Sequence, residues 1–99
     1  MECYVKIHDS LMGNVVGVCD KELLGKSFRE GNVHIDVNED FYGGVLMTIE
    51  EALEIIRSCF TANLVGERIV SAAIDEGIID EDMVLYIQDV PHAQVVYIS

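Results

Sequence analysis

The chain has 99 residues, of which 18 are acidic and 6 are basic, and its formal net charge is −12. Because 51% of the residues are hydrophobic, a disordered chain is excluded, since disorder needs low hydrophobicity together with high charge. A chain this short holds one hydrophobic core, so we expect a single domain over residues 1–99. The acidity disfavours direct binding to nucleic acids and to anionic membranes, both of which attract cationic side chains.

The sequence also bears on location. No apolar run approaches the roughly 18 residues that cross a bilayer, so no membrane segment is expected. Met1 is followed directly by a strand-like segment and not by the apolar stretch of a signal peptide. We therefore expect a cytoplasmic protein.

Three cysteines occur, at Cys3, Cys19 and Cys59. An odd count without a secretory leader argues against a disulfide framework. We expect buried thiols, with a cross-strand disulfide as the alternative, because the expected hairpin register pairs Cys3 with Cys19, Val5 with Gly17 and Ile7 with Val15. No CxxC or HxxxH spacing is present, so we expect neither a bound metal nor a cofactor.

The first half of the chain alternates between strand-like and turn-like segments. Apolar residues at every second position predict strands over residues 3–9, 15–19, 33–37 and 45–47. The segment 10–14 is typical of a turn and makes a hairpin of the first two strands. Asp20 is suited to cap a helical turn over residues 21–24.

Two helices are predicted next. Thr48 and Glu51 form a capping box, and apolar spacing extends this helix over about residues 49–60. The second helix is expected over about residues 62–76, because Gly77 is a typical residue for a left-handed cap at a helix end.

A last hairpin is predicted over residues 84–88 and 94–98, with a turn between them. Hairpins on both sides of a helical pair are typical of an α+β fold. We expect a two-layer sandwich in which both helices cover one face of a mainly antiparallel sheet. The residues expected in its core are Val5, Ile7, Val15 or Val16, Ile35, Leu53, Ile56, Ile69 and Ala73.

Half of the basic residues of this acidic chain lie within nine positions, at Lys21, Lys26 and Arg29. We interpret Lys21–Gly31 as an exposed segment that binds a protein or phosphate-bearing partner, with Phe28 adding apolar contact area. The alternative is ion pairing inside the fold, to acids such as Asp20, Glu22 and Glu30.

No nucleotide-binding or catalytic signature is present, so no catalytic residue is predicted and enzymatic activity stays open. The acidic run between Asp75 and Asp82 lacks the ligand pattern of a calcium loop and is interpreted as a solvated face, with a bound cation as the alternative. A polar cleft is a second hypothesis for a site, in which His92 in a turn supplies a proton donor or acceptor. The residues of that cleft are Asn63, Glu67, Arg68, His92 and Gln94.

Four stretches of the sequence together resemble the small archaeal proteins of domain-of-unknown-function family 424. They are CDKELLGKSFREG at 19–31, DFYGG at 40–44, ANLVGER at 62–68 and PHAQVV at 91–96. The resemblance covers nearly the whole chain. It implies an archaeal, cytoplasmic source, a compact α+β fold and an association with translation or ribonucleoprotein machinery, and it brings no established activity, ligand or catalytic residue.

Two functions are compatible with these observations. The first is a non-catalytic interaction module, an accessory to translation or ribonucleoprotein machinery, that uses Lys21, Lys26, Phe28 and Arg29. The second is a small enzyme or ligand-binding protein with a polar cleft around His92, Glu67 and Arg68. The two differ in whether the cleft residues converge on one concave surface.

Overall fold

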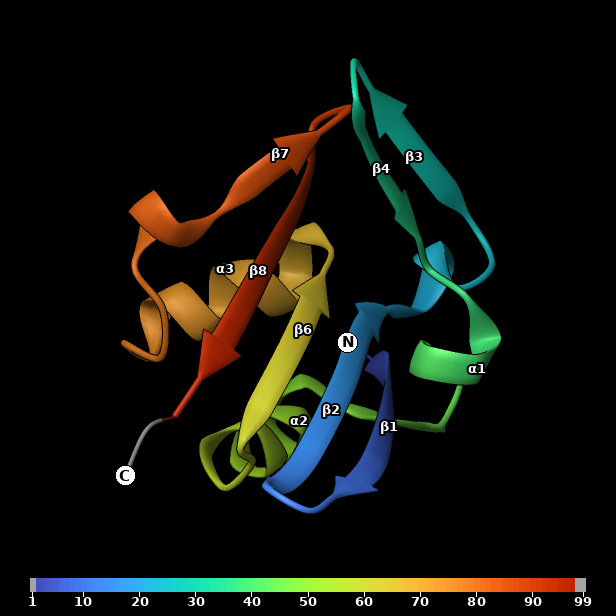
Figure 1. Ribbon diagram of the computed structural model, residues 1–99. Helices are drawn as coiled ribbons and strands as arrows, with labels where there is room; N and C mark the ends of the chain where they lie inside the picture. Colours follow the sequence, from blue (N-terminus) through green and yellow to red (C-terminus); the bar gives the residue numbers. More distant parts are fainter. Residues whose placement is uncertain (1, 98–99) are drawn as a thin grey trace.

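A computed structural model describes residues 2–97. Its centre is a six-stranded sheet in the order β5-β1-β2-β6-β8-β7 (Figure 1). Neighbouring strands are antiparallel except β2 and β6, which are parallel. The strands are β1 Glu2–Ser10, β2 Gly13–Asp20, β5 Val45–Thr48, β6 Thr61–Val65, β7 Leu85–Ile87 and β8 Val90–Val96.

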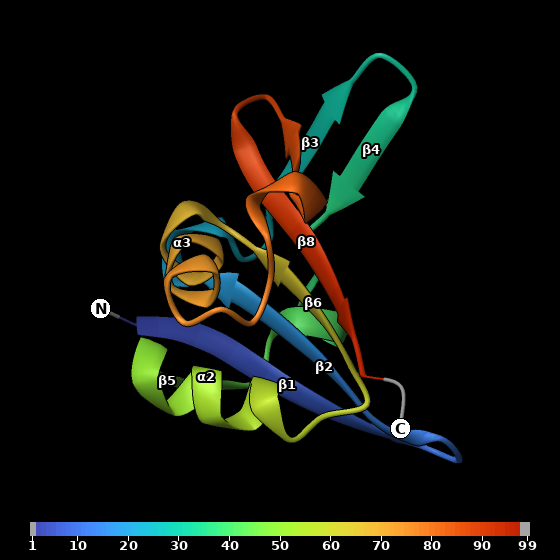
Figure 2. The ribbon, with the colours of Figure 1, turned by 90° about the vertical axis from the view of Figure 1, so that its left-hand side faces the viewer.

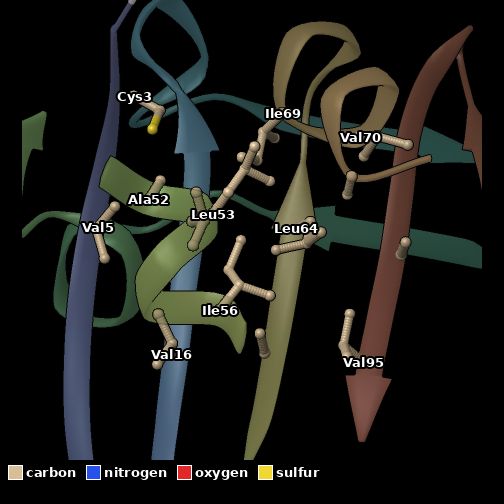
Figure 3. Packing of buried hydrophobic residues seen from close by; sticks show 14 of the residues in the cluster. Cys3, Val5, Val16, Ala52, Leu53, Ile56, Leu64, Ile69, Val70 and Val95 are labelled. Atoms are coloured by element: carbon tan, nitrogen blue, oxygen red, sulfur yellow. The ribbon is translucent and has the colours of Figure 1, made fainter. Parts of the chain in front are cut away.

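Two helices pack on one face of this sheet. They are α2, Ile49–Arg57, and α3, Glu67–Asp75, and Figure 2 shows both on the same side of the strands. The side chains of Ile56, Leu64 and Ile69 are buried between the helices and the sheet, together with Cys3, Val5 and Val16 (Figure 3). Burying such side chains contributes roughly 1.5–3 kcal/mol each, and most of the buried hydrophobic residues belong to this layer.

The opposite face of the sheet carries a second, smaller apolar cluster. Its buried members are Cys19, Val37, Tyr42 and Val65. It is covered by the short helix α1, Glu39–Tyr42, the 3-10 turn η1, Lys21–Leu23, and the hairpin of β3, Ser27–Glu30, with β4, Val33–Asp36. A further 3-10 turn, η2, spans Glu81–Met83 and precedes β7.

The α+β class and the mainly antiparallel sheet are confirmed. The capping box of α2 is also confirmed: the Thr48 hydroxyl accepts from the Glu51 amide at 3.2 Å, and the Glu51 carboxylate accepts from the Thr48 amide at 3.0 Å. The helix ends at Arg57, three residues before its expected end.

The prediction of a second helix over 62–76 was wrong in its first third. Residues Thr61–Val65 form β6, a central strand between β2 and β8, and α3 begins only at Glu67. A strand that is buried on both faces shows no alternation, so its sequence is indistinguishable from a helical segment. Gly66 separates the two elements with a φ of 124°, a conformation that L side chains rarely adopt.

The predicted register of the first hairpin was wrong by one residue. Val5 pairs with Val18 and Ile7 with Val16, so that Cys3 lies opposite Asp20. A one-residue shift moves a side chain to the other face. Cys3 therefore belongs to the large core and Cys19 to the smaller cluster, and both are free thiols, as is Cys59.

Two other expectations about the core changed. Ile7 is 48% exposed, because it lies on β1 past Val5, where β5 no longer pairs with β1, whereas its partner Val16 on the inner strand β2 is buried. Ile35 is half-buried in the smaller cluster, on the other side of the sheet.

The last hairpin turns earlier than expected. Gln88 and Asp89 have φ values of 52° and 64°, the left-handed geometry of a tight two-residue turn. His92 is therefore a strand residue of β8 and not a turn residue. The predicted end of this strand at residue 98 lies outside the described residues.

Within residues 2–97, no helix is long and apolar enough to cross a membrane.

Candidate functional site

The start of α3 is held by a carboxylate from a distant part of the chain. Asp20, at the end of β2, is 2% exposed. Its Oδ2 accepts from the Arg68 amide at 2.9 Å and its Oδ1 from the Ile69 amide at 3.0 Å. Burial raises the pKa of Asp20, and the two amide hydrogen bonds oppose that rise. Asp20 was expected to cap the turn η1, but it forms no cap there and caps α3 instead.

An open groove of about 590 Å³ lies between the start of α2 and the length of α3. Carboxylates dominate its lining: Asp20, Glu22, Glu50, Glu67 and Asp75. Arg68 also lines it, but its guanidinium is hydrogen-bonded to the Glu22 carboxylate. Hydrogen bonds from its own backbone amide and then from Arg68 lower the pKa of Glu22. The groove is consequently anionic, and an external anion would compete with Glu22 for Arg68.

The five residues of the expected polar cleft are divided between two places. Asn63 lies opposite Gln94 across β6 and β8, and His92 lies opposite Val65. Since Val65 faces the smaller cluster, strand alternation places Asn63, His92 and Gln94 on the sheet face away from the helices. Glu67 and Arg68 line the anionic groove beside α2 and α3. Burial lowers the pKa of His92, so its imidazole favours the neutral form.

The segment Lys21–Gly31 becomes η1 and the first strand of the β3–β4 hairpin, which projects from the body of the molecule (Figure 1). Lys21 lies 3.7 Å from the Glu2 carboxylate. Within residues 2–97, neither Lys26 nor Arg29 forms an ion pair. The alternative of ion pairing inside the fold therefore holds for Lys21, whereas Lys26 and Arg29 are exposed without such a pair within that range.

The acids expected to neutralise these two cations have other partners. Asp20 binds the start of α3 and Glu22 binds Arg68. The Glu30 carboxylate accepts from the Gln88 amide at 2.8 Å, and the Gln88 side chain donates to the Arg29 carbonyl at 2.8 Å. These two bonds attach the hairpin to the turn before β8, so Arg29 projects from a supported strand.

The two faces of the hairpin differ. Phe28 and Ile35 are cross-strand partners and both pack against the smaller cluster. Phe28 is therefore half-buried, and its packing against this cluster stabilises the position of the hairpin. Arg29 lies opposite His34 on the outer face, where His34 Nε2 is 3.1 Å from the Asp36 carboxylate. Sequence reasoning missed His34 as a neighbour of Arg29, because residues 27–30 were not predicted as a strand.

The acidic run between Asp75 and Asp82 is divided between two elements. Asp75 ends α3, whereas Glu81 and Asp82 belong to η2. Over residues 2–97, no group of three His, Cys, Asp or Glu side chains is arranged to hold a metal ion.

Comparisons with known proteins agree with this description of the fold. The family model described as "Protein of unknown function (DUF424)" matches residues 8–98. A crystal structure of an uncharacterized conserved protein from Methanopyrus kandleri is similar, with a TM-score of 0.75 and 25% sequence identity. The match covers 100% of this chain and 96% of that one. No curated protein matches significantly.

Proposed function

We propose that this chain, which belongs to DUF424, a family of proteins of unknown function, is a cytoplasmic, non-catalytic interaction module. Its docking surface is the outer side of the β3–β4 hairpin with the adjoining Lys26, and its partner is an acidic patch on another protein. The sheet with α2 and α3 serves as a two-layer support for this hairpin. We place this docking in translation or ribonucleoprotein machinery, the association that the family resemblance implies.

The observation that carries the proposal is the pair of exposed cations, Lys26 and Arg29, in a chain of net charge −12. In so acidic a chain, basic side chains are expected to pair with the chain's own carboxylates. The acids near Lys26 and Arg29, however, bind other groups. Two cations held in solvent on a supported hairpin offer charge-assisted contacts to a partner without first breaking an internal ion pair.

The anionic character of the rest of the surface adds selectivity. A partner that is acidic over a wide area is repelled by this chain, so the partner must present carboxylates over a small area that matches the hairpin. Such like-charge repulsion outside the contact suppresses wrong partners. The enzyme hypothesis receives no comparable support, since its polar residues lie on two sides of the sheet.

The test is a comparison of two doubly substituted proteins of equal net charge. Lys26→Gln with Arg29→Gln removes the two exposed cations. The control, Lys6→Gln with Lys21→Gln, removes two cations outside the hairpin. Proteins captured by the parent chain from cells that make it are identified, one is purified, and its dissociation constant is measured with all three forms by titration calorimetry.

We expect the hairpin variant to weaken binding at least about tenfold, the control to bind as the parent does, and both to keep the parent melting temperature. Binding should also weaken as potassium chloride is raised. Equal binding by the parent and the hairpin variant, capture of no protein at all, or a partner that is a phosphorylated small molecule or a nucleic acid would each contradict the proposal.

A further inference from the structure

The tip of the β1–β2 hairpin exposes two large apolar side chains. Leu11 is fully exposed and Met12 is 73% exposed. Two-residue hairpin turns normally use glycine, asparagine or aspartate, so apolar residues at both positions are unusual. The turn is also held in place: the Ser10 hydroxyl donates to the Gly13 carbonyl at 2.5 Å and accepts from the Met12 amide at 3.2 Å. Leu11 therefore projects from a fixed base.

A depression of about 450 Å³ lies beside this tip. Every side chain that lines it is uncharged, and the lining includes Met12, Asn14, Ser58, Cys59, Phe60 and Tyr97. Three segments form it, namely the β1–β2 turn, the connection from α2 to β6, and the end of β8, which meet at one end of the molecule (Figures 1 and 2). Hydrogen bonds hold them together, from the Phe60 amide to the Asn14 carbonyl at 3.0 Å and from the Tyr97 amide to the Phe60 carbonyl at 2.9 Å.

We propose that this uncharged end, defined by Leu11, Met12 and the depression, is the interface of a two-fold symmetric dimer of this chain. Leu11 of each copy enters the depression of the other. The projection and the depression lie side by side on the same end, so one contact satisfies both copies at once. That is the condition for a closed two-fold dimer, whereas a depression elsewhere on the surface would give an open chain of copies.

Charge favours a second copy at this place. Two chains of net charge −12 repel each other over most orientations. The grooves along α2 and α3 are lined mainly by carboxylates, and the arginines there, Arg57 and Arg68, are already paired with Glu76 and Glu22. Repulsion between these linings disfavours them as contacts between copies. The lining of the depression adds no charge to the contact, and burial of Leu11 and Met12 supplies the driving force there. Asp9, the carboxylate nearest to the tip in the sequence, faces solvent at its edge.

Dimerisation through this end would keep the β3–β4 hairpins accessible, whether or not they bind a partner. The β3–β4 hairpin and the β1–β2 turn lie at opposite ends of the molecule (Figure 1). A dimer through the uncharged end therefore leaves both β3–β4 hairpins free and points them away from each other. If the hairpin binds a partner, the dimer is bivalent and gains avidity for a partner with two sites.

Sedimentation equilibrium on the full chain tests the proposal, over a concentration series and in low and molar potassium chloride. We expect a species of twice the 11.0 kDa chain mass, whose association constant rises with salt because repulsion between the copies is screened. This salt dependence is opposite to that expected for docking at the β3–β4 hairpin, so failure of one proposal is distinguishable from failure of the other.

Three single variants locate the contact. Leu11→Asp changes the projection, Ser58→Glu places a charge in the depression, and Val45→Asp, at an exposed apolar residue on β5, is the matched control. We expect the first two to reduce the association constant at least about tenfold, and the control to dimerise as the parent does. At a protein concentration too low for dimerisation, Leu11→Asp should keep the parent melting temperature. Ser58→Glu should lower it, because Ser58 caps the end of α2 through the Ile55 carbonyl. A parent that stays monomeric at millimolar concentration in molar salt, or a dimer that survives either Leu11→Asp or Ser58→Glu, would overturn the proposal.

Discussion

Gly66 lies directly against the carboxylate of Asp20, with no space between them for a side chain. A β-carbon at position 66 would lie 2.6 Å from Asp20 Oδ2. This closeness lets the Asp20 carboxylate reach the first amides of α3. The junction of β2, β6 and α3 therefore depends on the carboxylate of Asp20 and on the lack of a side chain at Gly66.

We expect Gly66→Ala to be among the most damaging small substitutions in this chain. The alanine would need a φ near the 124° of Gly66 and would displace Asp20 from the amides it binds. Backbone strain and overpacking each cost roughly 1–3 kcal/mol, so the free energy of unfolding should fall by about 3 kcal/mol or more. Urea denaturation measures this loss. Gly31→Ala, also at a positive φ but with open space around it, is the control and should cost less.

Asp20→Asn tests the double hydrogen bond. An asparagine side chain has only one acceptor oxygen, so it can accept a hydrogen bond from only one of the two helix amides. Its NH₂ group would lie against the other amide, and two donors cannot form a hydrogen bond. A buried donor without a partner costs about 1–3 kcal/mol, which is the loss expected in the free energy of unfolding at neutral pH. Asp36→Asn, on the exposed hairpin, should change stability by less. An Asp20→Asn protein as stable as the parent would show that the second hydrogen bond is dispensable.

His92 should make stability depend on pH. Burial lowers its pKa below the ordinary 6.5, so in the interval between the two values the unfolded chain binds more protons than the folded chain. The free energy of unfolding should therefore rise with pH through this interval and fall as the solution becomes more acidic. Denaturation curves from about pH 5 to about pH 7 measure the slope. His92→Gln should reduce it, and an unchanged slope would contradict the assignment.

The three thiols should be unreactive in the folded protein. Burial raises the pKa of Cys3 and of Cys19 to about 12 and also raises that of Cys59, so little thiolate is present at neutral pH. A thiol reagent should titrate three groups only after denaturation. Fast reaction of any thiol in the native protein, or a count of one after denaturation without reductant, would contradict this expectation.

Salt should stabilise the fold. The chain has 18 acidic and 6 basic side chains, and repulsion among the acids lowers the stability of the compact state. Raising potassium chloride from low to molar concentration screens this repulsion. The melting temperature should therefore rise, as measured by circular dichroism at a protein concentration too low for dimerisation. A constant or falling melting temperature would show that the acids are spaced too far apart to repel one another.

Features that depend on neighbours in the chain could be predicted from the sequence. The capping box of Thr48 and Glu51, the start of α2 and the alternating strands β1 and β2 all rest on residues a few positions apart, so local geometry determines them. The charge balance likewise follows from residue counts. The clustering of Lys26 and Arg29 in an acidic chain is also visible in the sequence alone, whereas its role in binding a partner stays a prediction.

The tertiary structure decided what depends on contacts between distant residues. Thr61–Val65 became a strand because β2 and β8 lie on either side of it, and the two-residue turn at Leu11 set the register that separates Cys3 from Cys19. Asp20 binds amides 48 and 49 positions away, a partnership that no local spacing indicates. Its carboxylate is satisfied only when strand and helix meet, so the sequence supplied the acid, and packing determined which helix it caps.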